Sequence, residues 1–295
     1  MLFRSTWSGK GTTLYLRPRM QVTVRDLLLG VTTASANDAS VALAEAAAGS
    51  TAAWLALMNA RAKALGMTAR HFATPNGWPD GGQTKVSAQD LVKLAQALVS
   101  EHPALYRRYV GHPAFVWNGA QFNNHDPFAG TVPGADGIKT GHSGEAGFNF
   151  LGTVQRAGRR LVVVVAGTPS EAARANVARE LIEWGFSGFA SRQLALTGAI
   201  VGSAEIQDGA AREVPLALLH PLTVAIQPGG RARVSSRIVY RGPLRAPLRK
   251  GAVVAELELR IDDGPPARFP LAAARAVNRA GPFDRVVGGL LGLFG

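Results

Sequence analysis

The chain contains no cysteine among its 295 residues, which excludes disulfides, thiolate metal sites and a cysteine nucleophile. It also has no stretch near the ~18 to 20 uncharged apolar residues that a membrane-spanning helix needs. Acidic residues are few, since 20 Asp and Glu stand against 32 Lys and Arg, and the net charge is +12. The hydrophobic content of 47% excludes a disordered chain, and the length allows two domain-sized cores.

The first residues lack the apolar segment of a signal peptide. Residues 1–11 are instead rich in Ser, Thr and Gly, and they lead directly into a strand-like stretch, Thr13–Leu16. This composition is typical of a loop inside a domain, and it is unusual for the start of one. The sequence therefore raises the hypothesis that the beginning of the protein is missing.

The first third of the chain is dominated by helical signals. Apolar periodicity, with Gly49 and Gly66 at C-cap positions, predicts helices over residues 24–31, 38–48 and 53–65. Ser87 and Asp90 have the spacing of a capping box, which predicts the start of a further helix. Residues 74–82 are rich in Pro, Asn, Asp and Gly and predict a loop.

The periodicity changes after Gly134. Residues 147–155 and 160–166 predict two strands joined by a tight turn, and the unbroken apolar run Leu161–Val165 predicts a strand buried on both faces. Residues 170–184 predict a helix with an apolar stripe made by Ala173, Val177, Leu181 and Trp184. Helices that flank a sheet with a hairpin at its edge predict an α+β domain.

From about residue 190 the pattern becomes that of strands. Apolar and polar residues alternate over residues 222–226, 234–241 and 256–261, which predicts a small antiparallel β-sandwich. The last fourteen residues carry a helical apolar stripe, made by Phe283, Val286, Val287, Leu290, Leu291 and Phe294. We therefore predict three parts, namely an α+β domain over residues 1–187, a β-rich domain over residues 188–275 and an amphipathic tail over residues 276–295.

Two short motifs stand out in the α+β part. Ser35-Ala36-Asn37 falls in the break between two predicted helices, and Asp136-Gly137-Ile138-Lys139-Thr140-Gly141-His142 precedes the strand pair. Each has a simpler explanation when taken alone. Asn37 could be the N-cap of the next helix and Ser35 a turn residue, and Lys139-Thr140-Gly141 could be a solvated strand end.

Together, the two motifs suit acyl transfer. This reaction needs a hydroxyl nucleophile, an amine that takes and returns its proton, and donors aimed at the developing oxyanion. A Ser hydroxyl that faces a Lys ammonium across a cleft can pass a proton to a leaving amine. Lys139 and Thr140 can hold a substrate carboxylate, and Gly141 lets a peptide lie close against the strand.

The sequence resembles the D-alanyl-D-alanine carboxypeptidases, which are low-molecular-mass penicillin-binding proteins of the S-x-x-K, S-x-N and K-T-G type. The matching segments are Thr13–Leu28, Ser35–Ala44, Met58-Asn59, Leu65-Gly66-Met67, His71-Phe72, Asn76-Gly77 and Gly137–Asn149. The resemblance covers nearly the whole chain. It implies a partial penicillin-binding/β-lactamase-like domain, and a serine-type enzyme that trims the terminal D-Ala from peptidoglycan pentapeptides through an acyl-enzyme.

The resemblance also implies roles for individual residues. Ser35 would pass the proton and Asn37 would orient the substrate amide, so these two and Lys139 are the candidate catalytic residues. The candidate substrate-binding residues are Lys139, Thr140, Gly141 and His142. A hydrogen-bonded structural role for His142 stays equally open. No cofactor is implied, and a metal site finds no support because the six His are scattered.

The expected partners follow from the same resemblance. They are peptidoglycan stem peptides as substrates and β-lactams as inhibitors. The implied location is the periplasm, with peripheral attachment to the inner membrane through residues 282–295, which as a helix span only about 21 Å and would lie in the interface. The basic run from Arg231 to Lys250 comes without a nucleic-acid-binding motif, so no nucleic-acid partner is expected.

One element of the family is absent from the chain. The family's nucleophilic Ser and its base Lys lie in an S-x-x-K element upstream of S-x-N, but none of the six lysines has a Ser three residues before it. Either the sequence starts at an internal Met, or it is a truncated, non-catalytic relative associated with peptidoglycan or the membrane. In both cases we expect the 295 residues alone to be inactive.

Overall fold

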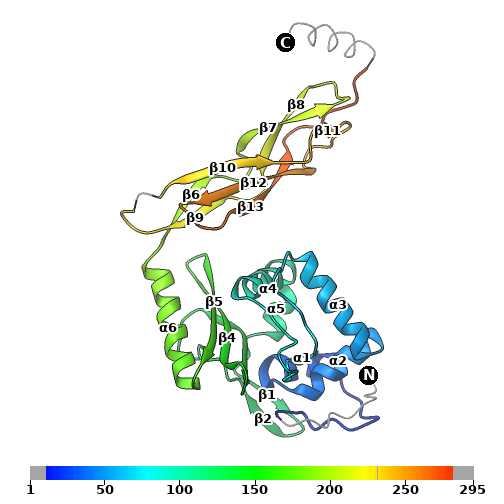
Figure 1. Ribbon diagram of the computed structural model, residues 1–295, viewed down its shortest axis with the longest axis vertical. Helices are drawn as coiled ribbons and strands as arrows, with labels where there is room; N and C mark the ends of the chain where they lie inside the picture. The colour runs from blue at the N-terminus through cyan, green and yellow to red at the C-terminus, as the bar shows by residue number, and fades with distance from the viewer. Residues whose placement is uncertain (1–10, 231, 282–295) are drawn as a thin grey trace. The chain divides into compact units, whose positions relative to one another are not determined.

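The computed structural model describes residues 11–230 and 232–281. Of the predicted tail over residues 276–295, the part from residue 282 onward lies outside the described residues. The chain divides into two compact units, Met1–Phe186 and Ser187–Gly295, which are coloured blue to green and green to red in Figure 1. The first unit is α+β and the second is β-rich. The predicted fold class is therefore confirmed.

Helices form the first half of the first unit. They are α1 (Val24–Leu29), which continues into the π-helical turn η1 (Gly30–Ala34), then α2 (Asn37–Ala48), α3 (Thr51–Ala64), α4 (Ala88–Glu101) and α5 (Pro103–Tyr109). The predicted capping box of α4 is present, because Ser87 and Asp90 exchange both of its hydrogen bonds. Buried Asp90 also accepts the backbone N–H groups of Thr68 and Ala69, which fixes the loop after α3 to the start of α4.

The stretch Thr13–Leu16 does not form the strand that its composition suggests. Its backbone instead bonds to a side chain, since the buried carboxylate of Asp38 accepts the N–H groups of Leu14 and Leu16. A carboxylate with several backbone donors replaces the strand partner that these groups would otherwise need. The segment is thereby tied to the first turn of α2.

A three-stranded antiparallel sheet forms the second half of the unit, in the order β3 (Ala135–Ser143), β4 (Gly147–Arg156) and β5 (Arg159–Thr168). The predicted hairpin between the last two strands is confirmed. Residues on both faces of β5 are packed, with Val163 and Val165 on one side and Val162 and Val164 on the other. Figure 1 shows α6 (Glu171–Ser187) on one side of the sheet and α4 with α5 on the other.

The strand β3 lies at the edge of this sheet, and among the described residues it pairs with β4 alone. Its second edge therefore keeps backbone N–H and C=O groups that no described strand uses. Such an edge can accept an extended peptide as an additional strand.

The buried face of α6 differs from the predicted stripe. The buried residues of the helix are Arg174, Ala178 and Ile182, whereas Val177, Leu181 and Trp184 of the predicted stripe are exposed. The buried face therefore begins one residue later than the apolar stripe, and it includes an arginine.

A short hairpin, β1 (Ala114–Trp117) with β2 (Ala120–Asn123), has no counterpart among the predicted elements. Phe115 packs into the core around Leu14 and Leu27, and the indole N–H of Trp117 donates to the carbonyl of Leu14 at 2.9 Å. The hairpin thus covers the segment that Asp38 holds.

The second unit contains a six-stranded sheet in the order β10-β12-β13-β8-β7-β11 and a two-stranded sheet of β6 and β9. Its strands are β6 (Ala190–Ala195), β7 (Ile200–Gln207), β8 (Glu213–Leu218), β9 (Leu222–Ile226), β10 (Val234–Val239), β11 (Leu244–Arg245), β12 (Val253–Ile261) and β13 (Ala267–Ala273). Residues of both sheets share one core, which also holds Val277. The pairing is antiparallel except between β7 and β11.

No single described helix is long and apolar enough to cross a membrane. Only α2 and α3 taken together, with a bend of 85° between them, have the required length and composition.

Candidate functional site

Ser35 lies where η1 ends. Its backbone is left-handed, with φ 60° and ψ 35°, a conformation that residues other than glycine seldom adopt. The N–H groups of Ser35 and Ala36 both bond to the carbonyl of Gly30. The backbone around the Ser35 side chain is therefore fixed on its N-terminal side, and α2 begins two residues later.

Lys139 of β3 meets this serine. Its Nζ donates to Ser35 Oγ at 2.8 Å and to the carbonyl of Thr140 at 2.8 Å. Burial lowers the pKa of Lys139 to about 8, and the positive charge of Arg174 contributes to the shift. Part of the population therefore carries a neutral amine near neutral pH. The two sequence motifs, 104 residues apart, form one site.

Asn37 is the first residue of α2, and its N-cap is Ala36, so the N-cap alternative for Asn37 is wrong. Its side-chain Nδ2 donates to the carbonyl of Thr12 at 3.2 Å, and its Oδ1 accepts from Nδ2 of Asn76 at 3.0 Å. Asn76 belongs to the turn-rich loop over residues 74–82. This loop therefore borders the site.

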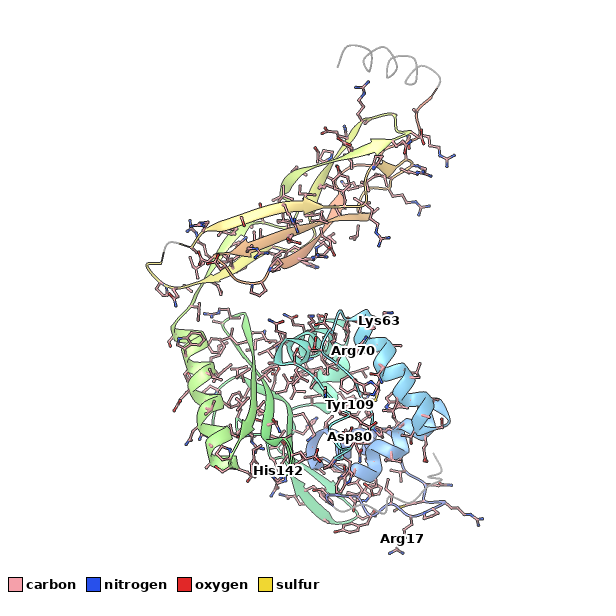
Figure 2. The ribbon with its side chains drawn as sticks, viewed as in Figure 1. Arg17, Lys63, Arg70, Asp80, Tyr109 and His142 are labelled. Carbon is pink, nitrogen blue, oxygen red and sulfur yellow. The ribbon has the colours of Figure 1, made fainter. Side chains whose placement is uncertain are left out.

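The remaining motif residues continue along β3. Thr140 and Gly141 lie opposite Phe150 and Asn149 of β4, and a Cβ atom on Gly141 would meet nothing within 4 Å. His142 is exposed, and its ring stacks on Phe148 with 3.9 Å between centroids. Figure 2 shows His142 at the lower end of the sheet.

Asp136, at the start of the same motif, anchors β3. Its carboxylate accepts hydrogen bonds from both terminal nitrogens of Arg160, each at 2.7 Å, and from the hydroxyl of buried Thr153. Its backbone carbonyl accepts the hydroxyl of Tyr106 at 3.0 Å, and burial raises the pKa of Tyr106 to about 12. These contacts join β3 to β4, β5 and α5 three residues before Lys139.

Two residues of the site are not among those predicted. Arg174 of α6 is 4% exposed, and its Nη2 donates to the carbonyl of His125 at 3.2 Å. Its Nε has no hydrogen-bond partner among the described residues. No pattern distinguishes this arginine in the sequence, whereas Asn76 stands in an Asn-Gly pair that marks a turn.

Metal ligands do not gather in the described part of the chain. Over residues 11–230 and 232–281 no three His, Asp or Glu side chains lie close enough to hold a metal ion.

Comparisons with known proteins agree with one another over both units. The profile of the D-alanyl-D-alanine carboxypeptidase family matches residues 4–170, and that of the C-terminal domain of penicillin-binding protein 5 matches residues 189–279. The chain is 34% identical over 275 residues to D-alanyl-D-alanine carboxypeptidase DacD of Salmonella typhimurium strain LT2, which covers 92% of this chain and 70% of the relative.

Solved structures are similar as well. Penicillin binding protein 5 from Haemophilus influenzae aligns with a TM-score of 0.72 and 28% identity, over 91% of this chain and 78% of that chain. The ampicillin-bound form of penicillin-binding protein D2 from Listeria monocytogenes aligns with a TM-score of 0.57 and 31% identity, over 63% of this chain and 75% of that chain.

Proposed function

The chain belongs to the D-alanyl-D-alanine carboxypeptidase family, and we propose that it serves as a serine-type enzyme that removes the terminal D-Ala from peptidoglycan pentapeptides. The observation that carries the proposal is the 2.8 Å contact between Lys139 Nζ and Ser35 Oγ. It places a hydroxyl beside an amine of lowered pKa on the edge strand β3, and Asn37 follows two residues after that hydroxyl.

Substrate binding uses that edge. An extended peptide that ends in D-Ala-D-Ala pairs its backbone with β3, as in strand addition to a sheet. The free space beside Gly141 leaves room for the peptide to approach. The positive charges of Lys139 and Arg174, together with the hydroxyl of Thr140, attract the terminal carboxylate.

Proton transfer uses Ser35 and Lys139. A serine hydroxyl attacks the carbonyl carbon of the penultimate D-Ala and gives its proton to the base Lys of the S-x-x-K element. The C–N bond breaks, and the leaving amine of the terminal D-Ala takes a proton from Ser35 Oγ. Lys139 replaces that proton, because its Nζ already donates to Ser35 Oγ, and it regains a proton from the base Lys. Water then hydrolyses the ester and releases the shortened peptide.

The attacking serine is not among the 295 residues under this proposal. It belongs to an S-x-x-K element, and no lysine of the chain has a Ser three residues before it. The absence of this element also motivates the second candidate function, a non-catalytic relative that associates with peptidoglycan or membrane. The 295 residues alone are inactive under both candidates.

The experiment compares the chain with an extended chain, in which a family segment that carries S-x-x-K precedes the 295 residues. Each is incubated with a pentapeptide ending in D-Ala-D-Ala, and free D-Ala is measured. Release by the extended chain, and its loss in the Lys139→Ala variant of that chain, supports the enzyme. A folded extended chain that releases no D-Ala leaves the non-catalytic candidate.

The periplasmic side of the inner membrane is the proposed location. The family acts on peptidoglycan, which lies there. The argument for attachment is the apolar stripe of the last fourteen residues, 282–295. Such a stripe binds by burying its apolar face at the level of the lipid headgroups.

A further inference from the structure

A chain of hydrogen bonds fixes the carboxamide of Asn37. The backbone N–H of Trp78 donates to Asn76 Oδ1 at 3.4 Å, Asn76 Nδ2 donates to Asn37 Oδ1 at 3.0 Å, and Asn37 Nδ2 donates to the carbonyl of Thr12 at 3.2 Å. All three bonds run in the same direction. Two side-chain amides thus connect two backbone groups.

The direction of these three hydrogen bonds follows from the two backbone groups at their ends. A backbone N–H can only donate and a backbone carbonyl can only accept. The Trp78 N–H therefore selects the oxygen of Asn76, and the Thr12 carbonyl selects the nitrogen of Asn37. Rotation of either amide by 180° would place two donors or two acceptors face to face. Asn37 keeps one N–H and one oxygen lone pair that these bonds do not use.

Close packing holds the three segments together. Gly11 has a φ of +92°, and a Cβ at this position would lie 3.0 Å from Asn37 Nδ2 and 3.0 Å from a ring carbon of Trp78. The loop is also braced internally, since the carboxylate of Asp80, labelled in Figure 2, accepts the hydroxyl and the N–H of Thr84. The Thr84 hydroxyl bond lowers the pKa of Asp80. Asn76 is thus presented by a loop of defined shape.

We propose that Asn76 is a positioning residue of this enzyme, which acts through Asn37 and determines which edge of that amide faces the substrate. With Asn76 in place, Asn37 offers one N–H donor and one acceptor to a substrate amide, whose own C=O and N–H are complementary. This inference rests on the proposed function, because it assumes that Asn37 meets the substrate.

The test uses Asn76→Asp in the extended chain, and the measured quantity is the second-order rate constant of acylation by fluorescent penicillin. The substitution preserves the size of the side chain but replaces the Nδ2 donor with a carboxylate oxygen. Two acceptor oxygens then face each other where Asn76 Nδ2 now donates to Asn37 Oδ1 at 3.0 Å. We expect the rate constant to fall roughly tenfold or more at pH 7. As the pH approaches about 4, the new carboxyl takes up a proton and can donate again, so the ratio of variant to parent recovers.

A double-mutant cycle separates positioning from a general effect on the fold. In the Asn37→Ala background, Asn76→Ala causes no further loss, because the group through which it acts is already gone. Asn118→Asp, the same change at an exposed turn residue between β1 and β2, is the matched control and leaves the rate constant unchanged.

Each outcome has a distinct meaning. If the parent is acylated and Asn76→Asp is acylated equally fast, or the losses from Asn37→Ala and Asn76→Ala add fully, this inference fails and the proposed function stands. If the folded parent is not acylated, the proposed function fails and takes the inference with it.

Discussion

Lys139 Nζ lies 2.8 Å from Ser35 Oγ. The serine stands at the left-handed end of η1, and the lysine stands on the edge strand of a sheet, so the contact joins the helical part of the first unit to its sheet. The same ammonium donates to the carbonyl of Thr140. The hydrogen bond that holds the helical part and the sheet together at this point is therefore also the one proposed for proton transfer.

The burial of Lys139 predicts a pH-dependent stability. Its pKa falls from 10.5 to about 8 in the folded state, so between these values the unfolded chain binds more protons than the folded chain. The free energy of unfolding that Lys139 contributes therefore rises as the pH rises from 8 to 10.5. Relative to Lys139→Met, we expect the parent to gain on the order of 1–3 kcal/mol between pH 7 and pH 10.

Urea unfolding of the 295-residue chain at the two pH values measures this difference. Lys63→Met removes an exposed lysine of α3 and is the matched control. A parent-to-variant difference at Lys139 that stays constant from pH 7 to pH 10 contradicts the lowered pKa.

The left-handed backbone of Ser35 predicts a difference between two substitutions. Ser35→Gly and Ser35→Ala both remove the hydroxyl, so both should suppress acylation of the extended chain by penicillin. Glycine adopts a φ of 60° without strain whereas alanine does not, so Ser35→Gly should be more stable than Ser35→Ala by about 1 kcal/mol. Chemical denaturation of both variants checks the order, and equal stabilities would contradict it.

The anchor of β3 predicts a contrast between two ion pairs. Asp136→Ala removes a bidentate partner of Arg160 and a partner of buried Thr153, so it should cost about 2 kcal/mol of unfolding free energy. Glu101→Ala breaks the exposed pair with Arg61 and should cost less than about 0.5 kcal/mol. Thermal and urea unfolding compare the two, and similar losses would show that Asp136 is not an anchor.

The tail predicts membrane binding. Deletion of residues 282–295 should abolish co-sedimentation of the chain with vesicles that contain anionic lipid, because the deleted segment supplies the apolar stripe. Replacement of Leu290 and Leu291 by Ser is a milder variant that keeps the length. Unchanged sedimentation of the deletion variant would rule out attachment through this segment.

Much of the fold follows from periodicity and caps, but α6 shows the limit of such patterns. Val177, Leu181 and Trp184 form the more apolar stripe, yet the buried face contains Arg174. The positive charge of the guanidinium helps to lower the pKa of Lys139, and the group donates to the carbonyl of His125. Where a charged group is buried beside a functional site, hydrophobicity alone does not identify the buried face.

The candidate site was predictable only in part, because its residue types can be read from the sequence but its contacts cannot. The motifs identify Ser35, Asn37 and Lys139 by residue type and order, but their contacts depend on how distant segments fold. The bond from Asn76 to Asn37 joins residues 39 positions apart, and the strands of the β1–β2 hairpin, with four residues each, are too short for a clear alternation. Such features need the three-dimensional structure.

Covalent labelling by fluorescent penicillin tests directly whether Ser35 and Lys139 belong to an acyl-transfer site. The 295-residue chain and the extended chain are incubated with the probe, denatured and separated by electrophoresis. We expect a labelled band for the extended chain, none for the 295-residue chain, and a weak band for the extended chain with Lys139→Ala. A labelled 295-residue chain, or a folded extended chain without label, would contradict this expectation.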